Sequence, residues 1–112
     1  MSEPAPLPTA CEAALSAALR PALFKALCDP VRVSIVARLA TRQDPVAVSD
    51  LVACCGIDFS GVSRHLKLLR QAGVVSATRE GRSVRYSLNS DALCQVLRAS
   101  ADALEQCSEQ AG

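Results

Sequence analysis

The stretch SDLVACCGIDFSGVSRHLKLLRQAG, residues 49–73, decides the fold of this chain. Its first part predicts a short helix capped by Ser49 and ended by Gly56, since glycine readily takes the left-handed position after a helix. The turn IDFS follows, and it offers Asp58 or Ser60 as the cap of a longer helix that ends before Gly73. A short helix, a tight turn and a longer helix together predict a helix-turn-helix.

The longer helix separates apolar from basic side chains. Val62, Leu66 and Leu69 recur at helical spacing and are expected to face the core. The other positions predict an exposed face that enters the major groove of DNA, with Arg64 reading guanine edges and Lys67 holding phosphate. The candidate DNA-binding residues of this helix are Ser60, Gly61, Ser63, Arg64, Lys67 and Arg70.

After Gly73 the sequence changes to a period of two. The runs VVSATR and RSVRYSL flank Glu80 and Gly81, and glycine allows the positive φ that a tight hairpin turn needs. The pattern predicts a β-hairpin that forms a wing beside the helix-turn-helix. Its basic side chains are candidate contacts to phosphates or the minor groove: Arg79, Arg82 and Arg85.

The rest of the chain predicts helices. Thr9 and Glu12 form a capping box for the first helix, and Asp29 with Pro30 opens another helix that ends at Ala40. One face of that helix is expected to be apolar, through Val33, Val36, Ala37 and Ala40.

The expected fold class is mainly α with a β-hairpin wing, in the order α-α-α-α-α-β-β-α. The expected organisation is a flexible arm at 1–8, a winged helix-turn-helix domain at 9–107 and a tail at 108–112, with the helix-turn-helix at about 49–72, the wing at about 74–88 and dimer helices at about 9–19 and 91–107.

Charge and composition narrow the possible functions. The net charge is +1, yet residues 61–88 hold six basic residues and one acid, which indicates a polyanionic partner. No apolar stretch approaches about 20 residues, and the N-terminus has an early acid and three prolines, so we expect a cytoplasmic protein without a membrane span. The sequence has no C-x-x-C pair and no nucleotide-binding loop, which argues against an enzyme.

Three segments resemble the ArsR/SmtB family of winged-helix repressors: LFKALCDPVRVSIVARLA, VSRHLKLLRQAGVV and REGRSVRYSL, which span most of residues 23–88. The resemblance implies a homodimer that represses an operon and leaves double-stranded operator DNA when a metal ion or small inducer binds. It also implies that the first and last helices form the dimer interface. His65 recurs in family members with unrelated inducers, so we expect a packed side chain there and not a metal ligand.

Six cysteines in a chain expected to be cytoplasmic indicate metal or redox chemistry more than a disulfide framework. Many arsenic sensors of the family carry the motif C-V-C-D-L, but this chain reads AVSDL at residues 47–51, which excludes that site. Cys54 and Cys55 lie further along the same helix. Adjacent helical side chains project about 100° apart, yet near a helix end two thiols can swing together.

Trivalent arsenic or antimony suits thiolate ligands, and we expect one of them as the inducer, with no catalytic cofactor. Some arsenic sensors of the family combine N-terminal cysteines of one subunit with a helix-turn-helix cysteine of the other. That resemblance implies Cys11 as a third ligand across the dimer, beside Cys54 and Cys55. Cadmium, lead or mercury at the same cysteines is an alternative. A thiol redox or persulfide switch is another, with Cys107 partnered by Cys28 or Cys11; Cys94 faces elsewhere, and Cys28 is expected in the core.

Overall fold

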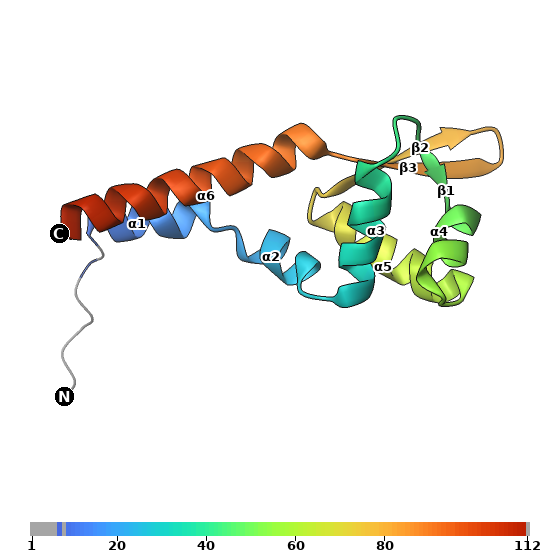
Figure 1. The fold of residues 1–112 in the computed structure, drawn as a ribbon, viewed down its shortest axis with the longest axis horizontal. Coiled ribbons are helices and arrows are strands. Elements are labelled where there is room, and N and C mark those ends of the chain that lie inside the picture. The colour runs from blue at the N-terminus through green and yellow to red at the C-terminus, as the bar shows by residue number, and fades with distance from the viewer. Residues whose placement is uncertain (1–6, 8, 112) are drawn as a thin grey trace. The chain divides into compact units, whose positions relative to one another are not determined.

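The structure is a computed structural model that describes residues 7 and 9–111. It is mainly α-helical with a β-hairpin wing, as predicted, and it adds a two-residue strand that the sequence analysis missed (Figure 1). The predicted arm at 1–8 lies outside the described residues except for Leu7. The elements are α1 (Ala10–Ala18), α2 (Pro21–Leu27), α3 (Pro30–Ala40), β1 (Val46–Ala47), α4 (Val48–Cys55), α5 (Phe59–Gln71), β2 (Val75–Glu80), β3 (Ser83–Leu88) and α6 (Ser90–Ala111).

The chain divides into two compact units. The winged unit is Pro21–Leu93, and the helical unit joins the residues up to Arg20 with those from Cys94 onward. Helix α6 begins in the winged unit and continues through the helical unit. None of the helices in the described part of the chain is both long and apolar enough to cross a membrane.

The core of the winged unit forms around α5. Val62, Leu66 and Leu69 are fully buried, which confirms the predicted apolar face of that helix. Helix α3 contributes a different face from the expected one: Ile35 and Leu39, one turn apart, are buried, while Val33 is 50% exposed. The two bulkier side chains bury more apolar area than the valine and alanine face would, and this favours the observed orientation.

Because of strand β1, helix α4 begins one residue before the predicted cap, Ser49. Val46 and Ala47 pair with Tyr86 and Arg85 of β3, so extended backbone runs up to the helix and α4 begins at Val48. Its N-cap position is Ala47, which has no side-chain hydrogen bond, and the predicted cap at Ser49 is therefore wrong because Ser49 lies inside the first turn. Gly56 ends the helix with φ of 68°, as predicted.

Asp58 is the cap of α5, one of the two caps that the sequence offered. Its carboxylate accepts a 2.8 Å hydrogen bond from the backbone N–H of Gly61. A Cβ at position 61 would lie 2.8 Å from Asp58 Oδ1, so a side chain there would displace the cap. Gly61, expected as a DNA contact, therefore has a structural reason to lack a side chain.

Replacing Asp58 by Ala should lower the free energy of unfolding by about 1 kcal/mol, because the cap bond to Gly61 is lost. Asp58→Asn is the matched control, since asparagine caps helices about as well. Urea denaturation followed by circular dichroism measures both variants. Equal stability of Asp58→Ala and wild type would contradict the role of the cap.

The three strands form one antiparallel sheet in the order β1-β3-β2. Strands β2 and β3 pair from Val75↔Leu88 to Glu80↔Ser83, and Gly81 makes the turn with φ of 62°. This hairpin confirms the predicted wing.

In the helical unit, α1 and α6 run antiparallel. Cys11 pairs with Cys107 near one end, and the Ser100 hydroxyl donates to the carbonyl of Ala18 at 3.2 Å near the other. Thr9 caps α1 by accepting from the backbone N–H of Glu12, as predicted. Helix α6 is longer than expected, since residues 108–111 continue it instead of forming a tail.

Candidate DNA interface and thiol sites

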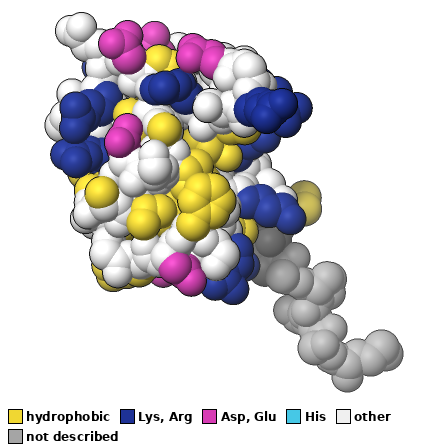
Figure 2. Space-filling view, turned by 90° about the vertical axis from the view of Figure 1, so that its right-hand side faces the viewer, with side chains coloured by type: hydrophobic (Ala, Val, Ile, Leu, Met, Phe, Trp, Pro, Cys, Tyr) yellow, Lys and Arg dark blue, Asp and Glu magenta, His cyan; other side chains and the backbone are white. Residues whose placement is uncertain are grey.

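The outer face of α5 carries the basic side chains that the sequence predicted. Arg64, Lys67 and Arg70 are exposed, as is Ser60, while Gly61 and Ser63 are half-buried. The apolar residues of the same helix are turned into the core, so burial of that face fixes which side chains point outward. Figure 2, which views the wing end of the winged unit, shows several Lys and Arg groups around an apolar patch.

The three arginines of the wing differ in their surroundings. Arg79 and Arg82 are exposed beside the turn. Arg85 is half-buried: its Nε lies 3.5 Å from Glu80 Oε2, and its Nη1 donates to the carbonyl of Pro45 at 3.5 Å. Arg79 and Arg82 are therefore free to reach a polyanion, whereas Arg85 is held against the sheet.

Phe59 is an exposed surface residue for which the sequence predicted no role. It is the first residue of α5 and is 61% exposed, next to the exposed Ser60. Periodicity gave no signal for it, because a residue at a helix start belongs to no repeating face. An exposed aromatic ring there can contact the methyl group of thymine.

His65 is half-buried and bonded to another helix. Arg32 Nη1 of α3 lies 3.2 Å from His65 Nδ1, so the guanidinium donates and the ring nitrogen accepts, which places the ring proton on Nε2. Arg32 also donates to the carbonyls of Lys25 and Ala26, which lie in the last turn of α2. Arg32 thereby ties α2, α3 and α5 together, and this role had no signal in the sequence.

Cys54 and Cys55 end α4, and their Sγ atoms lie 3.4 Å apart. Cys54 is exposed and Cys55 is half-buried. Burial raises the pKa of the Cys55 thiol to about 11, helped by its contact with Cys54, while the positive charge of Arg38 acts in the opposite direction. Arg38 Nε is buried and has no hydrogen-bond partner among the described residues. The sequence predicted that these thiols can approach each other, and they do.

The remaining cysteines fall into two groups. Cys11 and Cys107 form a disulfide with an S–S distance of 1.98 Å, which is one of the pairings that the sequence left open for Cys107. Cys94 is exposed on α6. Cys28 is also exposed, and its Sγ donates to the carbonyl of Lys25, so the expectation that it is a core residue is wrong. It lies just past the end of α2, where the chain turns at the surface.

Within the residues 7 and 9–111, no three His, Cys, Asp or Glu side chains are grouped so that they could hold a metal ion.

The chain is similar to known DNA-binding regulators in both sequence and structure. A family model described as "Helix-turn-helix domain" matches residues 27–76. The HTH-type transcriptional regulator CmtR of Mycobacterium tuberculosis is 43% identical over 87 residues, which cover 78% of this chain and 70% of that protein. The HTH-type transcriptional repressor SmtB of the same species is 38% identical over 89 residues, covering 80% of this chain and 62% of that protein. The chain spans about three fifths of the length of several such relatives.

Solved structures of related regulators have a similar fold. The homodimeric winged helix-turn-helix DNA-binding domain of Mb0332 from Mycobacterium bovis matches with a TM-score of 0.63 and 26% identity, over 91% of this chain and 93% of that one. The structure titled "cadmium metal-sensor CMTR from Mycobacterium tuberculosis" matches with a TM-score of 0.51 and 43% identity, over 60% of this chain and 67% of that one.

Proposed function

Because the chain belongs to the ArsR/SmtB family of winged helix-turn-helix transcriptional regulators, we propose that it represses transcription and that a thiophilic inducer releases it from its operator. The observation that carries the proposal is the pair of sulfur atoms of Cys54 and Cys55, 3.4 Å apart at the end of the helix that leads into α5.

DNA binding in this proposal uses the exposed part of α5 and the wing. The N-terminal half of α5 enters the major groove, where the Arg64 guanidinium donates to the edge of a guanine. Lys67, further along the helix, neutralises a phosphate. Arg79 and Arg82 contact the backbone or minor groove from the wing. Arg85 positions the wing through Glu80 and Pro45 and contributes charge more than a direct contact.

The two sulfur atoms have a suitable spacing for one shared ion. Two thiolates bound at about 2.3 Å each, with an angle of about 95–109° at the ion, stand roughly 3.4–3.8 Å apart. The observed 3.4 Å lies within that range. Such a site needs little movement of Cys54 or Cys55, apart from loss of their protons.

Trivalent arsenic or antimony is the inducer that we favour, because both ions prefer thiolates in a three-coordinate site. Cys11 is the candidate third ligand from a second subunit. It is available only after reduction, since Cys11 is bonded to Cys107 in the structure. Cadmium is the main competitor, because the relative CmtR is titled a cadmium sensor.

The position of the pair connects inducer binding to DNA release. Cys55 is the last residue of α4, and only Gly56 and Ile57 separate it from the Asp58 cap of α5. An ion that fixes Cys54 and Cys55 acts on this short connection, and it releases DNA if it binds the DNA-free conformation more tightly. A coupling free energy of about 1–3 kcal/mol corresponds to a 5- to 150-fold loss of operator affinity.

Homodimerisation through the terminal helices is also part of the proposal. Leu97 and Leu104 lie two turns apart on α6 and are 44% and 49% exposed, so they form an apolar strip that a second copy can cover. The matched Mb0332 domain is titled homodimeric.

The proposed function is tested by fluorescence anisotropy of the reduced protein on DNA from its own upstream region, at fixed salt. Binding followed by release with arsenite or cadmium supports it. A protein that binds the DNA no better than an unrelated duplex of the same length contradicts it.

A redox-responsive repressor is a second candidate, and the Cys11–Cys107 disulfide favours it. In this case peroxide oxidises the two thiols to the disulfide and is itself reduced to water, and the closed α1–α6 pair changes operator affinity. Peroxide should then shift the anisotropy of wild type but not of Cys107→Ser. An equal shift in both proteins would exclude this pair as the switch.

A further inference from the structure

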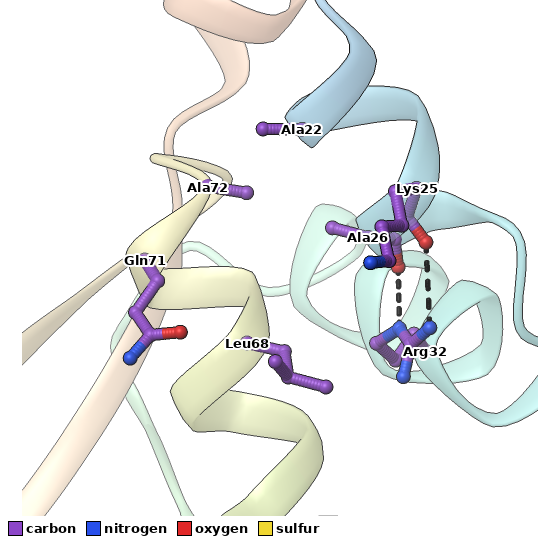
Figure 3. Close-up of a pocket in the computed structure, with 7 residues that line it drawn as sticks. All are labelled: Ala22, Lys25, Ala26, Arg32, Leu68, Gln71 and Ala72. Atoms are coloured by element: carbon purple, nitrogen blue, oxygen red, sulfur yellow. Dashed lines mark hydrogen bonds between the residues drawn. The ribbon is translucent and has the colours of Figure 1, made fainter.

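A pocket of about 220 Å³ lies within the winged unit, and neither Cys54 nor Cys55 lines it. Helices α2 and α3 form one side of it and the C-terminal half of α5 forms the other, as Figure 3 shows. The lining residues are Ala22, Lys25, Ala26, Arg32, Leu68, Gln71 and Ala72.

The lining combines apolar surface with positive charge. Three alanines and Leu68 supply the apolar part, and Leu68 is 46% exposed although it is a large aliphatic residue. Lys25 and Arg32 are the charged residues of the lining, and both are cationic. Three N–H groups of Arg32 are bonded, to Lys25, Ala26 and His65, which leaves two of its five for another acceptor. A pocket of this chemistry suits an anion with an apolar body.

The volume limits the size of that ligand. An engineered apolar cavity of about 150 Å³ holds benzene, and pockets for drug-sized ligands begin near 300 Å³. A pocket of about 220 Å³ therefore fits a single ring or a short branched chain that carries one carboxylate. From this geometry we propose that the pocket binds a small organic carboxylate, such as a one-ring aromatic acid.

The same pocket touches the DNA-reading helix. Leu68, Gln71 and Ala72 belong to α5 or its C-cap, and Arg32 bonds both the end of α2 and His65. A carboxylate held by Arg32 shares that guanidinium with His65. The ligand therefore acts on α5 at a place separate from Cys54 and Cys55. Any effect on operator affinity rests on the proposed function, but binding itself does not.

The test is titration of the ¹⁵N-labelled full chain with sodium benzoate, followed by amide chemical shifts in the absence of DNA. We expect saturable shifts centred on Lys25, Ala26 and residues 68–72, with a Kd on the order of 1 mM for a ligand of this size. Benzyl alcohol, a ring of similar size without the charge, should bind about threefold more weakly, since one exposed ion pair contributes a factor of up to about five.

Two variants test the position. Ala22→Leu fills the pocket from its rim and should abolish the shifts at 68–72, while Lys25→Gln should weaken benzoate binding about threefold. Arg98→Gln, which removes a charge from exposed α6, is the matched control and should bind as wild type does. The proposal is overturned if benzoate still binds to a folded Ala22→Leu variant, or if benzyl alcohol binds as tightly as benzoate. It is also overturned if Lys25→Gln weakens DNA binding but leaves benzoate binding unchanged.

Discussion

An Arg64→Ala variant is expected to bind operator DNA roughly 5- to 150-fold more weakly than wild type, because a bidentate contact to guanine contributes about 1–3 kcal/mol. Arg64 is exposed on α5 and its neighbours Val62 and Leu66 anchor the helix in the core, so the variant should fold normally. Anisotropy titrations at fixed salt measure the loss, and operator variants with single base changes should show relaxed specificity at one position.

Two other variants separate the contribution of base contacts to DNA affinity from that of positive charge. Lys67→Ala should weaken binding to all sequences alike and reduce the slope of log affinity against log salt by about one. Arg98→Ala removes an exposed charge outside the basic segment and should leave operator affinity nearly unchanged. If Arg64→Ala and Arg98→Ala bound equally well, α5 would not be the reading helix.

The pH dependence of inducer binding should distinguish arsenic from cadmium. Burial raises the pKa of the Cys55 thiol to about 11, so this thiol is protonated between pH 6 and 8. Cadmium binding displaces that proton into solution, and its affinity should rise about tenfold per pH unit for each displaced proton, or about 100-fold from pH 6 to 8 through Cys55 alone. Arsenite is neutral As(OH)₃, and its hydroxide leaves as water with the thiol proton. Its affinity should stay flat over the same range.

Isothermal titration in buffers of different ionisation enthalpy counts the released protons directly. For cadmium, Cys55→Ser should remove one proton from that count, whereas Cys94→Ser should not change it. A cadmium affinity that is independent of pH would show that the Cys55 thiol is not a ligand.

Local sequence signals predicted the helix-turn-helix and the wing well. Apolar spacing at Val62, Leu66 and Leu69 and the glycines at 56 and 81 each specify one local conformation, and the structure has them all. The start of α4 was missed because it depends on β1, a two-residue strand that exists only through pairing with β3. The buried face of α3 was missed because two apolar faces compete there, and packing against the rest of the unit selects Ile35 and Leu39.

The candidate sites were predictable only in part. Adjacent cysteines before a glycine indicated that their sulfur atoms could meet, and they do. The Cys11–Cys107 pairing joins residues 96 positions apart, and the sequence left several partners open. The hydrogen bond between Arg32 and His65 could not be predicted, because a contact between two helices that are far apart in the sequence leaves no periodic pattern.

The assignment of Cys54 and Cys55 as the inducer ligands is tested most directly by one anisotropy experiment. Three reduced proteins are each bound to operator DNA at fixed salt and titrated with arsenite and then with cadmium. They are the wild type, the double variant Cys54→Ser/Cys55→Ser and the matched control Cys28→Ser/Cys94→Ser. We predict that at least one of the two ions releases wild type and the control, while the Cys54→Ser/Cys55→Ser variant stays bound. Equal release of all three proteins from the DNA would contradict this assignment. It would also be contradicted if neither ion released the wild type from the DNA.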